Sequence, residues 1–242
     1  MRRTILALTL ILGACDDKAS APDPVVVATT IDAATVGTIK GKVLFSGTAP
    51  KPSKISMASE CAGLHASTPL TQDVLVHDGR LQNVFVYVKE GLEKLVFAWP
   101  KTPIRIANAN CLYEPRVAGV QVHQEIEFTN EDVTVHNIHG FGEESQFNFS
   151  IQGKGSHNHK LRSPVIMTRL KCDIHPWMIG WIGALPHPFF HVTGSDGTFE
   201  LKGLPPGDYV IEAWHEKYGA KTLKAKLDAQ GSLDVEFVYS EK

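Results

Sequence analysis

Apolar and polar residues alternate with a period of two along most of this chain, which is the pattern of half-buried β-strands. The clearest runs lie at 39–45, 84–89, 223–227 and 233–239. Turn signals such as Asp78-Gly79 and Asp196-Gly197 separate the runs. Helical periodicity is almost absent. The sequence therefore predicts an all-β protein of sandwich architecture.

The first residues have the features of an export signal. Two arginines precede an apolar stretch, 4–12, that is too short to span a bilayer as a helix. The stretch ends in Leu-Gly-Ala before Cys15, and this ending resembles the bacterial lipoprotein signal. The resemblance implies a signal peptide over 1–14 and lipidation of the Cys15 thiol, which anchors the protein to a membrane. A plain secretory peptide is the alternative. We expect a bacterial cell-envelope protein that faces the periplasm or the exterior.

Residues 16–24, after the signal, are small and polar and contain proline. Such a composition cannot bury a core, so 15–36 is expected to be a flexible tether. The remainder, about two hundred residues, is enough for one large β domain or two small ones. The formal net charge of −2 gives no indication of a nucleic-acid partner.

Two stretches near the C-terminus, 193–201 and 203–209, carry the turns Asp-Gly and Leu-Pro-Pro-Gly. They resemble the carboxypeptidase regulatory-like domain, a small transthyretin-like sandwich. That family opens with strands like those at 39–43 and 83–88, which here lie far upstream. We therefore predict a discontinuous sandwich, 37–92 plus 191–242, with a second β domain at 93–190 inserted between its parts. Two sequential domains divided near His187 are the alternative.

Three side chains that bind soft metals share one expected loop. Cys172, His175 and Met178 stand between the alternating run 166–172 and the apolar run 179–185, so a loop between two strands can direct all three to one centre. Thiolate plus imidazole suits zinc or copper, and the thioether favours copper. A structural zinc site commonly uses paired Cys-x2-Cys motifs, which this sequence lacks. The loop therefore predicts copper and requires a second histidine.

A second histidine stands upstream in the string His136-Asn137-Ile138-His139. A His-Asn pair followed by a Cys-x2-His-x2-Met loop resembles the cupredoxins, and the short loop is similar to those of the amicyanin and plastocyanin type. The resemblance covers 103–186 and implies a Greek-key sandwich with one type 1 copper ion. It implies as copper ligands His136, Cys172, His175 and Met178. It also implies that the Asn137 side chain ties the histidine strand to the ligand loop.

Two positions near this site leave a choice. His139 is the alternative to His136; on an extended strand the two face opposite sides, because they differ by three residues, and the resemblance selects His136. Trp177, with Pro176, either forms an apolar rim around His175 where an electron-transfer partner docks, or packs inward.

The cysteines need separate accounts. Cys15 is assigned to lipid, and disulfides persist in the compartment of an exported protein. Three thiols remain, which is an odd number, so one of them does something other than pair. With Cys172 assigned to copper, Cys61 and Cys111 are expected to form a disulfide. A second metal site is the weaker alternative, because neither lies in a ligand-spaced cluster.

These observations favour an envelope electron-transfer protein with a mononuclear type 1 copper site and a redox partner protein. We do not expect an enzyme, because such a carrier transforms no substrate. The alternatives are a copper-binding or copper-delivery lipoprotein and a structural envelope module. A carrier should give an intensely coloured oxidised copper form. A delivery protein should hold and surrender copper(I), and a spacer should bind no copper.

Overall fold

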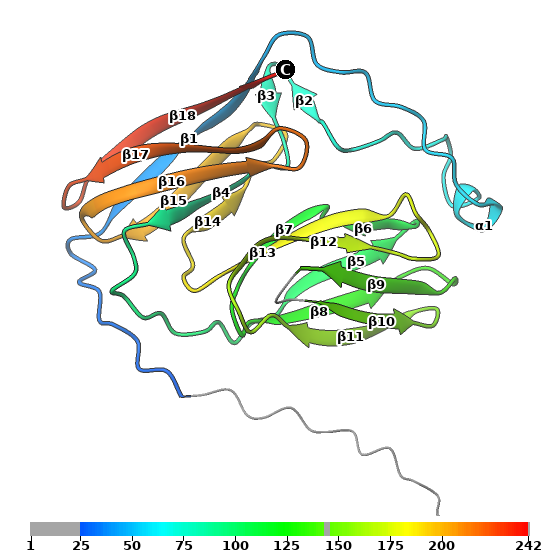
Figure 1. Ribbon diagram of the computed structural model, residues 1–242, viewed down its shortest axis with the longest axis horizontal. Helices are drawn as coiled ribbons and strands as arrows, with labels where there is room; N and C mark the ends of the chain where they lie inside the picture. The colour runs from blue at the N-terminus through cyan, green and yellow to red at the C-terminus, as the bar shows by residue number, and fades with distance from the viewer. Residues whose placement is uncertain (1–24, 143–145, 242) are drawn as a thin grey trace, which may run out of the picture.

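The computed structural model describes residues 25–142 and 146–241. The expected signal peptide, Cys15 and the tether up to residue 24 lie outside the described residues. Within them the protein is nearly all β, with eighteen strands and one short helix, α1 (Ser59–Ala62). No helix in this part of the chain is long and apolar enough to cross a membrane. The strands form two stacked sandwiches (Figure 1). The predicted all-β sandwich fold is confirmed.

Sandwich A takes its strands from both ends of the chain. Its five-stranded sheet has the order β15-β1-β3-β2, with β18 also paired to β1, and its four-stranded sheet has the order β14-β4-β16-β17. The strands of sandwich A are β1 (Gly37–Ser46), β2 (Val76–His77), β3 (Arg80–Leu81), β4 (Phe85–Glu90), β14 (Phe190–Val192), β15 (Thr198–Leu204), β16 (Gly207–His215), β17 (Gly219–Leu227) and β18 (Ser232–Ser240).

Sandwich B is formed by the strands in between. Its five-stranded sheet has the order β10-β9-β12-β13-β7, and its four-stranded sheet has the order β11-β8-β5-β6. The strands of sandwich B are β5 (Ile104–Ala109), β6 (Leu112–Glu114), β7 (Val117–Gln121), β8 (Glu125–Asn130), β9 (His136–Phe141), β10 (Phe147–Ile151), β11 (Gly155–Lys160), β12 (Val165–Lys171) and β13 (Ile179–Leu185).

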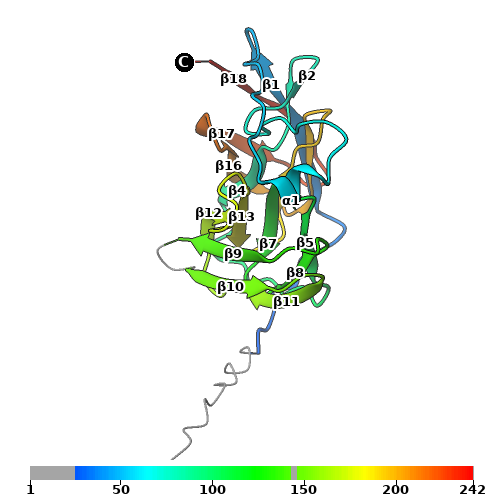
Figure 2. The ribbon, with the colours of Figure 1, turned by 90° about the vertical axis from the view of Figure 1, so that its right-hand side faces the viewer.

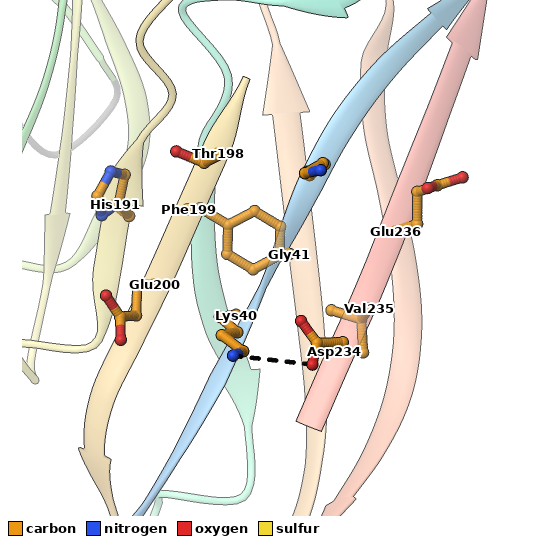
Figure 3. A pocket seen from close by; sticks show the side chains of 10 residues that line it. Lys40, Gly41, His191, Thr198, Phe199, Glu200, Asp234, Val235 and Glu236 are labelled. Carbon is orange, nitrogen blue, oxygen red and sulfur yellow. Dashed lines mark ion pairs between the residues drawn. The ribbon is translucent and has the colours of Figure 1, made fainter. Parts of the chain in front are cut away.

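The pairing of β1 shows how sandwich A is assembled. This strand pairs antiparallel with β15 and parallel with β18, so that Thr38 lies opposite Ser232 and Ser46 opposite Ser240. On the outer face of this sheet Lys40 pairs with Asp234 across 3.9 Å (Figure 3). The second sheet likewise joins β4 to β14 and β16. These pairings are those that a discontinuous sandwich requires, and the boundaries at 92 and 190 stay a prediction.

Each sandwich has its own buried core between its two sheets. In sandwich A the core joins Ile39 and Phe237 of one sheet to Ile211 of the other. In sandwich B it joins Ile106 to Ile182 in the same manner. The apolar face of each alternating strand is therefore turned inward, and burial of that face drives the packing of the sheets.

The interface between the sandwiches explains one departure from simple alternation. From Phe85 to Val88, both faces of β4 are buried. Phe85 and Tyr87 face sandwich B, while the valines face the core of sandwich A. Glycines at 119 and 183 make room for the Phe85 ring, since a Cβ at either position would lie within 3 Å of it. The interface therefore buries a third, smaller apolar cluster.

A partly buried ion pair also joins the two sandwiches. Arg116, just before β7, donates from Nε and Nη2 to both carboxylate oxygens of Glu216 at 2.6 and 2.8 Å. The indole Nε1 of Trp181 donates to the same carboxylate at 3.1 Å. Such a two-point contact fixes orientation as well as distance, so it holds the two sandwiches in one arrangement.

Two buried histidines of this region should make stability depend on pH. Burial lowers the pKa of both His187 and His215 to about 4, against 6.5 in the unfolded chain. Because the unfolded state binds more protons between these values, the free energy of unfolding should fall as pH drops below 6.5, by about 2 kcal/mol per histidine at pH 5. Urea unfolding at pH 7 and pH 5 measures this loss, and His215→Phe should reduce it. Equal midpoints at the two pH values would contradict it.

Candidate metal centre

The predicted site residues meet at one end of sandwich B. His136 is the first residue of β9, Cys172 follows the last residue of β12, and Met178 precedes the first residue of β13. These three strands are neighbours in one sheet, with Lys171 of β12 opposite both His139 and Ile179. The start of β9 and the loop between β12 and β13 therefore lie at the same end of this sheet.

One sulfur and two ring nitrogens converge there. Nδ1 of His136 and Nδ1 of His175 are 3.0 Å apart, and Sγ of Cys172 is 3.6 Å from Nδ1 of His175. These side chains are at most 1% exposed. Together they form one of the groups of potential ligand atoms that lie within 4.8 Å of one another.

The ligand loop is closed by its own backbone. The amide of Met178 donates to the carbonyl of His175 at 2.9 Å, and the amide of Cys172 donates to the carbonyl of Met178 at 3.3 Å. The Met178 side chain is fully buried in the same core cluster as Cys172. The chain thus buries a thioether in the same core cluster as the Cys172 thiol, on the loop that also carries His175.

The protonation of these groups suits a soft metal ion. Two ring nitrogens that face each other at 3.0 Å cannot both carry protons, because two donors repel each other. Burial, followed by the neighbouring His136, lowers the pKa of His175, which favours the neutral imidazole that metals bind. One thiol, two imidazoles and a buried thioether fit a copper ion by donor type.

Asn137 joins the histidine strand to the ligand loop. Its side-chain Oδ1 accepts from the backbone amide of Asp173, and its Nδ2 donates to Asp173 Oδ2 at 3.0 Å and to Asn148 Oδ1 at 2.6 Å. These bonds fix the loop between Cys172 and His175 against β9. The contact is the one that the cupredoxin resemblance implies for this residue.

The sequence reasoning missed Asp132, which supports His136 from behind. Its Oδ2 lies 2.8 Å from His136 Nε2, the nitrogen that points away from the cluster. The same carboxylate accepts the backbone amides of Asn110 and Cys111 at 2.8 Å. A carboxylate on the remote nitrogen sets which tautomer the imidazole adopts. The only sequence signal for this role is that Asp132 stands four residues before the candidate ligand His136.

Two alternatives at the site can now be placed. His139 lies beside Asp173, with Nδ1 3.0 Å from Oδ2, and stacks on Phe141. Within the described residues it belongs to none of the groups that bring three potential ligand atoms together. Trp177 is half-buried, packs against the core and donates from Nε1 to the carbonyl of Cys111 at 3.1 Å. Its ring centroid also lies 5.2 Å from that of His175, so Trp177 packs inward and borders this histidine at the same time.

The structure links Cys61 to Cys111 in a disulfide and leaves Cys172 as a free, buried thiol. Cys111 lies between β5 and β6, whereas Cys61 belongs to α1, far from it in sequence. The disulfide adjoins the candidate site, because both of its sulfurs lie within 4.8 Å of a ring nitrogen of His175.

No protein-family model and no curated protein matches this chain. Matches occur among solved structures. A Cu-containing nitrite reductase from Thermus scotoductus SA-01 is 18% identical with a TM-score of 0.34, over 50% of this chain and 28% of the reductase, well under half the length of that protein. An oxidised mutant of amicyanin is 19% identical with a TM-score of 0.32, over 34% of this chain and 81% of amicyanin.

A purple cupredoxin from Nitrosopumilus maritimus is 20% identical with a TM-score of 0.30, over 34% of this chain and 98% of that protein. Likenesses at this level carry no argument about the function of this chain. The function has to be argued from its own residues.

Proposed function

We propose that this protein is an electron carrier whose sandwich B is a cupredoxin-type domain with one type 1 copper site. The observation that carries the proposal is the convergence of Cys172, His136 and His175 in one buried cluster. The proposed ligands are these three residues and, as a weak axial ligand, Met178. When bound, copper would supply one-electron redox chemistry, and the protein would hold the ligands in place.

The surroundings of the cluster favour a carrier over a delivery protein. The ligands are held by β9, by the closed loop and by Asn137, and all are buried. A rigid site limits the rearrangement between oxidation states, which suits electron transfer. A protein that surrenders its metal needs an accessible site instead. For the same reason we propose a carrier rather than a catalyst, because a buried ligand set gives a substrate no open position.

We also propose that the protein acts in a bacterial cell envelope, anchored through Cys15 and exchanging electrons with a partner protein. The disulfide Cys61–Cys111 supports an oxidising compartment, because disulfides persist there.

Copper titration of the purified protein tests the proposed function. We expect one equivalent of copper(II) to produce an intense visible absorption and a paramagnetic resonance spectrum with narrow copper splitting. A colourless complex would contradict the type 1 site. No binding at all would leave the structural module as the better interpretation.

The axial assignment of Met178 predicts a mild effect of its replacement. In Met178→Leu the copper should remain bound and coloured, because the axial bond is long and weak, but the reduction potential should shift. Redox titration measures the shift. Met167→Leu is the matched control, since Met167 is also buried but lies at the interface between the sandwiches. If Met178→Leu removed the copper altogether, Met178 would be more than an axial ligand.

A further inference from the structure

The connection between β1 and β2, residues 47–75, leaves sandwich A and crosses to sandwich B. We call it the cap segment. It carries α1, which lies beside the end of sandwich B where β9 begins and β12 ends (Figures 1 and 2). The cap segment thus belongs in sequence to one sandwich and covers the candidate metal centre of the other.

The cap segment is firmly attached at this position. Its Cys61 is fully buried and bonded to Cys111. His65 Nε2 lies 2.8 Å from the carbonyl oxygen of Asn110. Met57 packs against the core of sandwich B. A covalent bond, a hydrogen bond and an apolar contact therefore fix α1 against the site.

The cap segment closes the side of His175 that is remote from the cluster. Nδ1 of His175 faces His136 and Cys172, so Nε2 is on the opposite edge of the ring. Nε2 is buried and makes no hydrogen bond within the described residues. The carboxylate of Glu60 in α1 is near it, with Oε1 at 3.8 Å.

A buried Nε2 needs an acceptor if Nδ1 holds a metal. An imidazole bound through Nδ1 carries its proton on Nε2, and a buried donor without a partner is destabilising because it has lost its hydrogen bonds to water. Metal-bound histidines usually donate this proton to a carboxylate, a carbonyl or water. His136 already has such an arrangement with Asp132 at 2.8 Å. Glu60 is the carboxylate that stands in the same relation to His175.

We propose that Glu60 is a positioning residue for His175: its carboxylate accepts a hydrogen bond from Nε2–H of His175 when the copper site proposed above is formed. The inference rests on that proposed function. The Glu60 side chain is half-exposed and can rotate, so a small movement brings it from 3.8 Å to hydrogen-bond distance. The adjacent Cys61 fixes the backbone of Glu60 through the disulfide. A segment of sandwich A thereby completes the metal centre of sandwich B.

The negative charge of Glu60 determines the direction in which its replacement should shift the reduction potential. A carboxylate near the metal stabilises the more positive oxidation state of copper by Coulomb attraction. In Glu60→Gln this charge is lost while an acceptor oxygen remains, so the reduction potential should rise. Glu60→Ala should raise the potential too and should also remove the acceptor. In the copper(I) form, the Nε2 proton of His175 should then exchange with water faster in Glu60→Ala than in Glu60→Gln.

Redox titration and proton magnetic resonance of the full chain give both readouts. Glu236→Gln is the control, because Glu236 is an exposed carboxylate on β18 of sandwich A. A potential shift in Glu60→Gln no larger than in Glu236→Gln would overturn the positioning role while the wild type stays blue. A wild type that gives no blue copper form would overturn the proposed function and this inference with it.

The covering role has a test that needs no copper. In the metal-free protein, Cys172 should react slowly with a thiol-alkylating reagent, because it is fully buried. The double variant Cys61→Ser with Cys111→Ser should speed this reaction, since α1 is then no longer bonded to sandwich B. Equal rates in folded wild type and folded variant would show that the disulfide does not hold the cover in place.

Discussion

Replacement of Cys172 by serine should leave a folded protein that no longer turns blue with copper. The intense absorption of a type 1 site belongs to the bond between copper and a thiolate, and an alcohol cannot replace it. Serine is close to cysteine in size, so the fully buried position should still pack. His136→Ala and His175→Ala should weaken copper binding or open the site to an outside ligand, because each removes a strong bond.

Copper binding should also be visible as stability, and Cys172→Ser should lose that gain. A ligand that binds only the folded state at a thousand times its dissociation constant stabilises it by about 4 kcal/mol. Visible spectra and urea unfolding with and without copper measure both effects. Met167→Leu is the control, because Met167 is buried at the interface between the sandwiches and its replacement should keep both the colour and the gain in stability. A coloured Cys172→Ser protein would refute the proposed site.

Phe85→Ala should be the most destabilising substitution at the interface between the two sandwiches. The Phe85 ring is fully buried, packs against Tyr87 and Phe190, and fits over the glycines at 119 and 183. Removing a buried phenylalanine costs about 3–5 kcal/mol, because apolar contacts are lost and a cavity remains. Denaturant unfolding measures this loss.

The same experiment shows whether the interface couples the sandwiches. Phe141→Ala is the control, since Phe141 is exposed and should cost much less. In the wild type, different probes of unfolding should give the same curve. In Phe85→Ala the curves from these probes should differ from one another, because the two sandwiches then unfold more independently. A cost near that of Phe141→Ala would show that the interface contributes little.

Most of the fold could be predicted from the sequence because strand periodicity is a local property. The alternation at 39–45 corresponds to the inward face of β1, and the spacing of Cys172 and His175 places both in one short loop. The run 84–88 shows the limit. Its valines and aromatics are both buried, and only the arrangement of the two sandwiches explains why.

The parts of the site that escaped prediction are those that depend on distant packing. Asp132 supports His136 only because the turn before β9 folds back on it. Glu60 reaches His175 only because the cap segment crosses from the other sandwich. Charged residues are frequent in loops, so the four-residue spacing between Asp132 and His136 is only a weak signal, and no local pattern marks Glu60.

The parallel pairing of β1 with β18 affects the order in which the parts of the chain can fold. Thr38 pairs with Ser232, which lies near the C-terminal end of the chain. Sandwich A therefore cannot form completely until nearly the whole chain is available. The strands of sandwich B are contiguous from Ile104 to Leu185 and bring most of their contacts together earlier. Local contacts form faster than distant ones, so the metal centre should be assembled while β1 still lacks its neighbours β15 and β18. During that interval the first strand is an open edge, and any factor that protects it would have to act there.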